Sequence, residues 1–345
     1  MTVKLRTGAA LKAISLIAAA CMAVSANAKS KPPIIDVHMH AMNPTEFDFP
    51  PPAGMCTPME MPVWDQRSPY GLQYMELYRK PPCKDPVWAA ETKEQLLSQT
   101  LATMRKYNIY GVAGGTPEMV KLWKTTAPTR IWSGLMLRMD YNYPPSLLEE
   151  LHAKGQLDVL AEVATQYEGI EPTDPQLEPY WAMAEKLDIP VGIHVGTGPQ
   201  GVIYMGSSHY RARMHSALTM EEVLVKHPKL RVYLMHAGYP KIDDLLALMY
   251  AHPQVYVDTG VIDYLVPTAD FHEYLRRIFQ AGFGKRVMFG SDQMVWAGTI
   301  ERAIRTIETA RFLTAEQKRD VFYNNAARFL RLDAATIARQ KAGGE

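Results

Sequence analysis

The sequence predicts a single (β/α)8 barrel of the α/β class. Eight short runs rich in β-branched and aliphatic residues alternate with segments of helical periodicity, as expected for βα units around a parallel sheet. Histidine and aspartate recur at the ends of several runs, where such a barrel builds its active site. The chain has 345 residues, and a barrel of this kind often needs about 200–250, so one domain with insertions accounts for the length.

The predicted elements follow one another regularly along the chain. Strands are expected at residues 34–40, 109–115, 130–138, 157–165, 189–196, 230–238, 254–260 and 286–292. Helices are expected after them, among them 93–107, 146–154, 178–187, 220–227, 241–252, 271–281 and 300–312, and residues 315–330 should form one or two closing helices. Eight strands that each precede a helix favour a closed TIM barrel over a doubly wound open sheet.

The chain begins with the three parts of a secretory signal peptide. A segment with three positive charges precedes an apolar run at 13–24, and residues 26–28 read Ala-Asn-Ala, a small-x-small cleavage site. The apolar run is shorter than the ~20 residues that span a bilayer, which disfavours a membrane anchor. We expect residues 1–28 to be removed and residues 29–345 to form one periplasmic or secreted domain. Lipid attachment at Cys21 is a weaker alternative, because three alanines precede it.

The charge balance argues against nucleic acid as a partner. The 37 Lys and Arg are matched by 36 Asp and Glu, a formal charge of +1 that falls to −2 when residues 1–28 are lost. Such a chain has no basic excess to neutralise phosphates. We therefore expect a small-molecule partner and no membrane contact after processing, and the sequence leaves open whether the chain forms a homodimer.

Cys56 and Cys83 remain after the signal peptide is removed. In an oxidising compartment the simplest expectation is a disulfide between them. It would close a loop of 27 residues and contribute roughly 3 kcal/mol by constraining the unfolded chain. Two buried free thiols are the alternative.

Two irregular segments interrupt the repeat. Both follow strands, where the loops of a barrel carry function. Residues 41–92 contain ten of the 25 prolines and seven aromatic residues, a composition that suits a packed but irregular lid. Residues 197–219 contain Arg211 and Arg213, which are candidates for binding an anionic substrate.

The strongest local signal is Asp36-Val37-His38-Met39-His40, at the end of the first strand. Residues i and i+2 of a strand share one face about 6.6 Å apart, so both imidazoles can converge on one ion. Asp36 points toward the same face one layer deeper, where it could orient a ligand or form internal hydrogen bonds.

Three further strands end in groups of the same kind. They supply His194 from the fifth strand, His236 from the sixth and Asp292 from the eighth. With the two histidines of the first strand, His194 and Asp292 make a ring of three nitrogens and one carboxylate, which suits one divalent ion. We expect Zn²⁺, with Mn²⁺ as the alternative. His236 is better placed to polarise a substrate or transfer a proton.

Together these motifs resemble the metal-dependent amidohydrolase superfamily, in particular its amidohydrolase-related TIM-barrel branch (amidohydrolase family 2). The combination is the D-x-H-x-H opening, His at strand five, His-x-Gly at strand six and Gly-Ser-Asp at strand eight. By this resemblance His38, His40, His194 and Asp292 are metal ligands, Asp292 is also a proton acceptor, and His236 is catalytic. Lactonases, other hydrolases and decarboxylases belong to this branch.

The fourth strand departs from the binuclear relatives, which carry a carboxylated lysine there. It contains no lysine, which supports a site for one ion. Glu162 is the nearest substitute and could be a ligand, could hold a ligand in place, or could form an internal salt bridge. Further substrate contacts are expected from Arg138, at the end of the third strand, and from Trp296, just after the eighth.

The leading hypothesis is an exported hydrolase that uses a metal-activated water on an ester, lactone or amide. Asp292 would take the proton of the water, and His236 would stabilise the oxyanion or protonate the leaving group. A nonoxidative decarboxylase of an aromatic or unsaturated acid is the rival within the family. A metal- or solute-binding barrel without turnover is the alternative of another class.

Overall fold

The computed structural model describes residues 1–2, 31–47 and 49–344. The part of the chain from Lys31 onward forms one compact unit. The expected signal peptide, residues 1–28, lies almost entirely outside the described residues. No helix among the described residues is long and apolar enough to cross a membrane.

Eight parallel strands form the barrel, and each lies within or almost within its expected range. They are β1 Ile34–Ala41, β4 Ile109–Gly115, β5 Ile131–Ser133, β6 Leu160–Val163, β7 Val191–His194, β8 Val232–Met235, β9 Val255–Asp258 and β10 Val287–Met288. Hydrogen bonds place them in two runs, β1-β4-β5 and β6-β7-β8-β9-β10. Nearly every residue of these strands is buried, as expected when helices cover the outside of a parallel sheet.

Two seams join these runs into a closed ring. Between β5 and β6, an isolated parallel bridge pairs Leu137 with Val163. Between β10 and β1, the amide of Val37 donates a hydrogen bond of 3.0 Å to the carbonyl of Phe289. The (β/α)8 barrel expected from the sequence is therefore confirmed.

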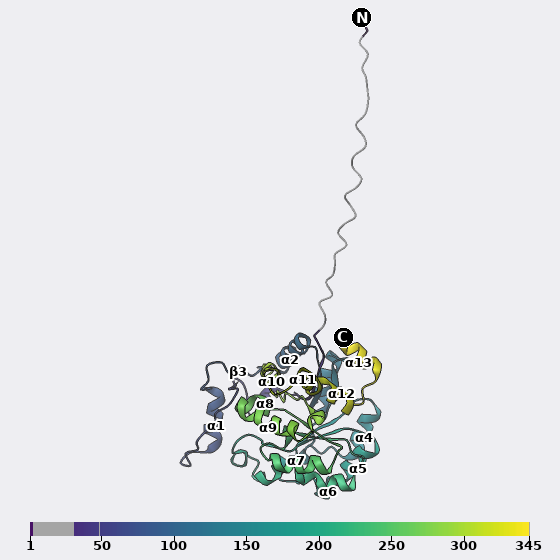
Figure 1. Ribbon diagram of the computed structural model, residues 1–345. Helices are drawn as coiled ribbons and strands as arrows, with labels where there is room; N and C mark the ends of the chain where they lie inside the picture. Colours follow the sequence, from purple (N-terminus) through teal and green to yellow (C-terminus); the bar gives the residue numbers. More distant parts are fainter. Residues whose placement is uncertain (3–30, 48, 345) are drawn as a thin grey trace. The chain divides into compact units, whose positions relative to one another are not determined.

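Helices follow the strands around the barrel (Figure 1). They are α2 Lys93–Tyr107, α3 Pro117–Thr126, α4 Pro145–Ala153, α5 Glu178–Lys186, α6 Glu221–Lys226, α7 Ile242–Ala251, α9 Thr268–Gln280 and α10 Thr299–Glu308, with a short α8 Ile262–Leu265 before α9. In α9 the spacing of Phe271, Leu275 and Ile278 puts these buried side chains on one face. Burial of such faces against the sheet holds the outer ring in place.

The insertion after β1 is folded and cross-linked. It contains a 3-10 turn Pro44–Glu46, β2 Gly54–Met55, α1 Tyr70–Arg79 and β3 Val87–Trp88, and β2 pairs with β3 in antiparallel orientation. A disulfide joins Cys56 to Cys83, with their Cα atoms 5.8 Å apart. The expected disulfide is therefore confirmed.

Hydrogen bonds attach this insertion to three loops at the carboxyl ends of barrel strands. The bonds run from Ala90 N to Val295 O (3.0 Å), from Met59 N to Leu265 O (2.9 Å) and from the Tyr70 hydroxyl to Gln200 O (2.9 Å). The partners follow β10, β9 and β7 in the sequence. The insertion therefore lies over the end of the barrel where the strands terminate, as a lid would.

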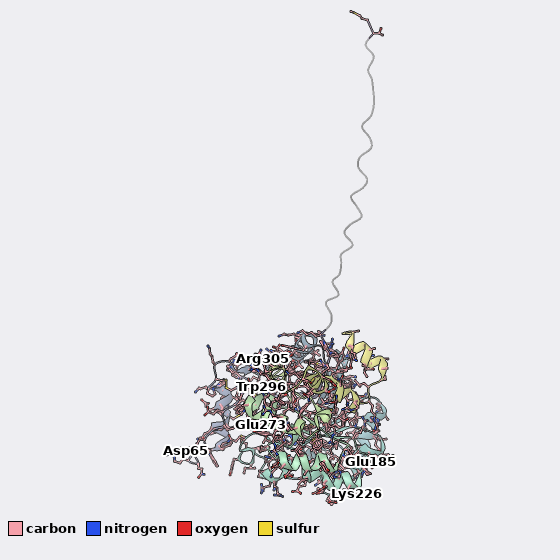
Figure 2. The ribbon with its side chains drawn as sticks, in the orientation of Figure 1. Asp65, Glu185, Lys226, Glu273, Trp296 and Arg305 are labelled. Atoms are coloured by element: carbon pink, nitrogen blue, oxygen red, sulfur yellow. A yellow bond between two sulfur atoms is a disulfide. The ribbon has the colours of Figure 1, made fainter. Side chains whose placement is uncertain are left out.

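An aromatic cluster fills the space under the lid. The indole of Trp296 is fully buried and donates its N–H to the Ala53 carbonyl at 3.0 Å. The rings of Phe47 and Tyr78 each lie 5.5 Å from it. In Figure 2 Trp296 lies among packed side chains, whereas Asp65 marks the outer tip of the insertion. Burial of these rings supplies much of the packing that holds the lid on the barrel.

The C-terminal segment covers the other end of the barrel. It contains α11 Ala315–Arg319, a π-helical turn Asp320–Asn324, α12 Asn325–Phe329 and α13 Ala334–Lys341. The expected closing helices are present, and α13 is an addition. Arg231, just before β8, donates to the Phe329 carbonyl at 2.9 Å. Asn108, just before β4, donates to the carbonyls of Lys31 (2.9 Å) and Gln340 (3.1 Å). These contacts are made at the amino ends of the strands.

Candidate metal centre

The side chains of His38 and His40, in the second half of β1, point toward Asp292. Nε2 of His40 lies 2.8 Å from Oδ1 of Asp292, and Nε2 of His38 lies 3.6 Å from the same oxygen. The two imidazole centres are 5.1 Å apart. The alternation of side chains along a strand therefore brings two ring nitrogens to one carboxylate, as the H-x-H spacing predicts.

The backbone holds Asp292 in an unusual conformation. Its φ is 48°, in the left-handed region, and that of His236 is 63°. A residue with a β-carbon pays about 1–3 kcal/mol there, and such residues concentrate at functional sites. The Asp292 amide donates to the His38 carbonyl at 2.7 Å, and the Tyr264 hydroxyl donates to the Asp292 carbonyl at 2.7 Å. These bonds fix the carboxylate opposite the histidines.

His194, Glu162 and His236 form the neighbouring part of the site. Nδ1 of His194 lies 2.5 Å from Oε1 of Glu162 and 3.0 Å from Nε2 of His236. Oε2 of Glu162 is 3.8 Å from Nε2 of His40, which connects the two parts. Nδ1 of His236 lies 2.9 Å from the Gly260 carbonyl. That carbonyl only accepts, so Nδ1 of His236 carries a proton and Nε2 faces the other side chains.

The donor atoms meet the requirements of a metal ion. His38, His40 and Asp292 each offer one ligand atom, all within 4.8 Å of one another, and the same holds for His38, Glu162 and His236. Nε2 of His38 and Nε2 of His194 are buried without a hydrogen-bond partner in the described part of the chain. A buried polar atom is costly when it is left unpaired, and a cation bound beside Asp292 would satisfy Nε2 of His38. His194 is in neither group, because its Nδ1 faces Glu162.

The charges of the site favour a cation. Burial raises the pKa of Asp292, but the positive charge of His38 and the contact with His40 outweigh it and leave the pKa below its ordinary value. Burial likewise raises the pKa of Glu162, and His194 holds it well below that range. Burial lowers the pKa of His38, yet Asp292 and Asp258 raise it to about 10. Two ionised carboxylates thus create a field that attracts positive charge.

Asp36 is occupied by internal hydrogen bonds. Its Oδ1 accepts from the amide of His38 at 3.1 Å and from the amide of Ser291 at 2.9 Å. Burial raises the pKa of this carboxyl to about 7. Asp36 therefore joins β1 to the end of β10 beneath the centre, the internal hydrogen-bonding role that the strand alternation left open.

The expected substrate contacts lie in different surroundings. Arg138, expected at the end of the third strand, is partly exposed, lies beyond the end of β5 and pairs with Asp140. Arg211 donates to the carbonyls of its own loop, and Arg213 pairs with Glu171 on the surface. Trp296 is fully buried under the lid. Of these four, only Arg138 has intermediate exposure.

Three residues that touch the site were not among those predicted from the sequence. Asp258, at the end of β9, contacts His38 and the backbone of His236. Gln293 accepts from the His40 amide at 3.0 Å and donates to its carbonyl at 2.8 Å. The ring of Tyr167 lies 4.8 Å from that of His194. Asp258 could have been found from its place, because a carboxylate at the carboxyl end of a barrel strand faces the same mouth as the histidines.

A family model described as amidohydrolase matches residues 35–332, which is most of the chain. The protein belongs to the amidohydrolase family. The resemblance seen in the motifs is thereby confirmed, and this amidohydrolase is an enzyme whose family acts on small molecules. The identity of its substrate and of its metal is a separate question.

Solved structures share the fold of this amidohydrolase at low sequence identity. A probable 2-pyrone-4,6-dicarboxylic acid hydrolase from Acinetobacter baumannii is 12% identical, with a TM-score of 0.57 over 87% of this chain and 99% of that one. A 5-carboxyvanillate decarboxylase from Sphingomonas paucimobilis is 14% identical, with a TM-score of 0.55 over 88% of this chain and 100% of that one.

A third structure, a 5-carboxyvanillate decarboxylase from Novosphingobium aromaticivorans with bound manganese, is 14% identical, with a TM-score of 0.52 over 76% of this chain and 88% of that one. No curated protein matches the sequence of this amidohydrolase. At these identities the neighbours establish the barrel fold and not a substrate.

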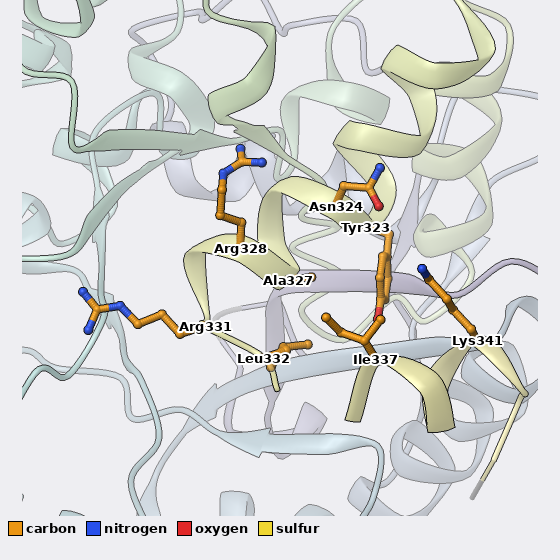
Figure 3. A pocket seen from close by; sticks show the side chains of 8 residues that line it. All are labelled: Tyr323, Asn324, Ala327, Arg328, Arg331, Leu332, Ile337 and Lys341. Carbon is orange, nitrogen blue, oxygen red and sulfur yellow. The ribbon is translucent and has the colours of Figure 1, made fainter. Parts of the chain in front are cut away.

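A cavity of about 510 Å³ lies at the other end of this amidohydrolase, between the π-helical turn, α12 and α13 (Figure 3). It is lined by Tyr323, Asn324, Ala327, Arg328, Arg331, Leu332, Ile337 and Lys341. Nε of Arg328 donates to the Tyr256 hydroxyl at 3.0 Å, and Arg331 pairs with Asp188. The guanidinium groups are thus engaged by neighbouring protein groups, and the histidines lie at the opposite end of the strands.

Proposed function

We propose that this amidohydrolase is an exported hydrolase that uses one divalent ion to cleave an ester, lactone or amide bond of a small molecule. The observation that carries the proposal is the approach of His38 and His40 to one oxygen of Asp292, at 3.6 and 2.8 Å. Two imidazoles and a carboxylate are the usual protein ligands of a catalytic zinc ion.

Each side chain of the site has its own role in the proposed reaction. A bound divalent ion supplies Lewis acidity and makes water a better nucleophile near neutral pH. Asp292, held ionised in the site, accepts the proton that the attacking water releases. His236 has its Nδ1 proton committed to the Gly260 carbonyl. In the cationic ring Nε2 carries a second proton, which it gives to the leaving group and regains from Asp292 after the reaction. His38, His40 and Asp292 would hold the ion, with His194 as the further expected ligand.

Burial helps this reaction. His38, His40, His194 and His236 are all at most 4% exposed, and Asp292 is 6% exposed. A site that excludes bulk water strengthens every electrostatic interaction within it. The lid supplies this exclusion in our proposal, and it must open for a substrate to enter.

The donor set suits two metals. Imidazole nitrogen with a carboxylate oxygen favours Zn²⁺, while a site richer in oxygen accepts Mn²⁺. We propose Zn²⁺, with Mn²⁺ as the alternative because one structural neighbour contains manganese. Metal analysis of protein purified without chelator decides between them.

Decarboxylation is the second candidate, because two of the structural neighbours are 5-carboxyvanillate decarboxylases. Both reactions would use the same ligands. Hydrolysis adds water to the substrate, whereas nonoxidative decarboxylation releases carbon dioxide without net addition of water.

The test is a screen of lactones, esters, amides and carboxylated aromatic acids in water enriched in ¹⁸O. We expect turnover with one ¹⁸O in the product, activity that is lost on chelation and restored by Zn²⁺ or Mn²⁺, and no activity in Asp292→Asn. Release of carbon dioxide without incorporation of ¹⁸O would replace hydrolysis by decarboxylation. Activity that survives complete metal removal would contradict the metal-dependent mechanism.

Export is proposed from the N-terminal pattern alone. Expression of the full chain in a Gram-negative host should give protein in the periplasmic fraction or the medium with Lys29 as its first residue. Protein that remains in the cytoplasm with Met1 intact would contradict this part of the proposal.

A further inference from the structure

We propose that Asp258 is the residue that positions His38 for metal binding, by holding the proton of His38 on Nδ1 and leaving Nε2 free as a ligand. The inference rests on the metal centre of the proposed function. It assigns a role to a side chain outside the expected set of ligands and catalytic residues.

Asp258 is fully buried at the end of β9, and both of its oxygens are used. Oδ2 lies 3.0 Å from Nδ1 of His38. Oδ1 accepts from the amide of His236 at 2.9 Å and from the amide of Gly260 at 2.9 Å. One carboxylate thus connects an expected metal ligand with the histidine expected to transfer protons.

The polarity of these contacts determines the tautomer of His38. Oδ1 of Asp258 accepts from two backbone N–H groups, and with Oδ2 as a further acceptor Nδ1 of His38 is the donor. When a metal ion displaces the second proton of the ring, the proton on Nδ1 stays with Asp258 and Nε2 offers its lone pair. Nε2 is the buried nitrogen that lacks a hydrogen-bond partner among the described residues and lies on the Asp292 side of the ring. A metal ion needs that lone pair.

The substitution Asp258→Asn would reverse the direction of the hydrogen bond to Nδ1 of His38 while keeping the size and shape of the side chain. The two backbone amides of His236 and Gly260 require an acceptor, so the amide oxygen must take the place of Oδ1. The amide NH₂ group then faces Nδ1 of His38, and since it only donates, Nδ1 must become the acceptor. The proton of a neutral His38 moves to Nε2, where it occupies the position that a metal would use.

Asp263 provides a matched control. It is also a buried aspartate, 1% exposed, five residues along the chain. Its Oδ2 accepts from the Thr259 hydroxyl at 3.0 Å. Burial raises the pKa of Asp263 well above its ordinary value. Asp263→Asn removes a buried carboxyl of the same kind but leaves the contact with His38 intact.

The experiment measures the dissociation constants of Zn²⁺ and Mn²⁺ by competition with a coloured chelator, in wild type, Asp258→Asn and Asp263→Asn. Loss of a group that orients a metal-binding histidine typically weakens affinity 10- to 100-fold. We expect that loss in Asp258→Asn and a change within about twofold in Asp263→Asn. The melting temperature of each metal-free protein separates loss of the fold from loss of affinity.

Two further outcomes overturn the proposal in different ways. If wild type binds metal and Asp258→Asn binds it equally well, or both variants lose affinity equally, the positioning role is wrong while the proposed function stands. If wild type binds less than about half an equivalent, the metal centre of the proposed function fails, and the positioning role fails with it.

A measurement on wild type covers the case in which Asp258→Asn does not fold. The ¹⁵N spectrum of histidine-labelled, Zn²⁺-loaded protein is compared with that of His38→Gln, which assigns the His38 signals. We expect a proton on Nδ1 and the metal on Nε2. The opposite assignment, with the proton on Nε2, overturns the proposal.

Discussion

Gly260 lies directly against the imidazole of His38. A β-carbon built on Gly260 would stand 2.6 Å from Nδ1 of His38 and 3.1 Å from the β-carbon of Asp292. Carbon atoms do not approach ring nitrogens so closely without displacement. His38 and Asp292 can therefore take their positions in the metal centre only because residue 260 has no β-carbon.

Gly260→Ala should weaken metal binding, because the added methyl group must displace His38 from Asp258 or from Asp292. We expect at least a tenfold rise in the metal dissociation constant, measured by chelator competition. Gly71→Ala is the control, since a β-carbon there would meet only the Met205 side chain at 3.7 Å. Equal affinities in wild type and Gly260→Ala would contradict the expected displacement.

His38→Ala should remove most of the bound metal. The substitution deletes a nitrogen near Asp292 and leaves the remaining groups too few to hold the ion tightly. The metal content of protein purified without chelator, measured by elemental analysis, should fall from about one equivalent to less than half. His209→Ala, at an exposed position of the loop that follows β7, should keep the wild-type content. A full equivalent in His38→Ala would exclude His38 as a ligand.

Reduction of the Cys56–Cys83 disulfide should destabilise the protein through its lid. Opening a cross-link that spans 27 residues increases the conformational entropy of the unfolded chain. This should lower the free energy of unfolding by roughly 3 kcal/mol. The double variant Cys56→Ser and Cys83→Ser should show that loss in urea unfolding, and a reductant should affect wild type but not the variant. If the reductant lowers the stability of both proteins equally, the effect does not come from this disulfide.

Arg138 should matter for binding an anionic substrate, and Arg213 should not. Arg138 lies in the segment that follows β5, and its charge is one of those that act on half-buried Tyr167 beside His194. Arg213 is 68% exposed and pairs with Glu171. With a carboxylated substrate from the screen, Arg138→Gln should raise KM about tenfold, while Arg213→Gln leaves it unchanged. The same KM in both variants would remove Arg138 from the substrate site.

Glu185 should make stability depend on pH. Burial raises its pKa, but the hydrogen bond from the Lys229 amide and the contact with His227 outweigh that, so the folded pKa lies below 4.5. A carboxyl with a lowered folded pKa stabilises the protein above its unfolded pKa, and the gain is lost as the pH falls through the folded pKa.

Because Glu185 is partly exposed, the gain should be about 1 kcal/mol or less. Glu185→Gln should therefore be less stable than wild type at pH 6, with the difference vanishing toward pH 3 in urea titrations. Glu222→Gln, on the exposed side of α6, should show no such pH-dependent difference. A constant difference between pH 3 and pH 6 would rule out the ionisation of Glu185 as its cause.

The strands could be predicted because each buried run is short, aliphatic and followed by a helical pattern. The same alternation predicted that His38 and His40 share a face, since side-chain direction along a strand is a local property. Which histidine sits nearest to Asp292 is not local. The structure puts His40 there, and it pairs His194 with Glu162 instead.

Other features depend on contacts between distant segments and were beyond the sequence. Asp258 is 220 residues from His38. Its place at a strand end indicates that it faces the mouth of the barrel, but which histidine it contacts depends on how the distant strands pair. Trp296 was expected to meet a substrate because of its position after the eighth strand. In the structure the aromatic residues of the insertion cover it, and no periodicity indicates which ring will pack on which.

The two hydrogen bonds of the Asn108 side chain indicate that the chain can be circularly permuted. Its side-chain amide reaches both the Lys31 carbonyl and the Gln340 carbonyl, so the segments around these two residues meet at Asn108. A short peptide could therefore join the two ends, and new ends could be opened in the exposed turn after α4, around Gly155. Such a circular permutant should keep the barrel and its metal centre.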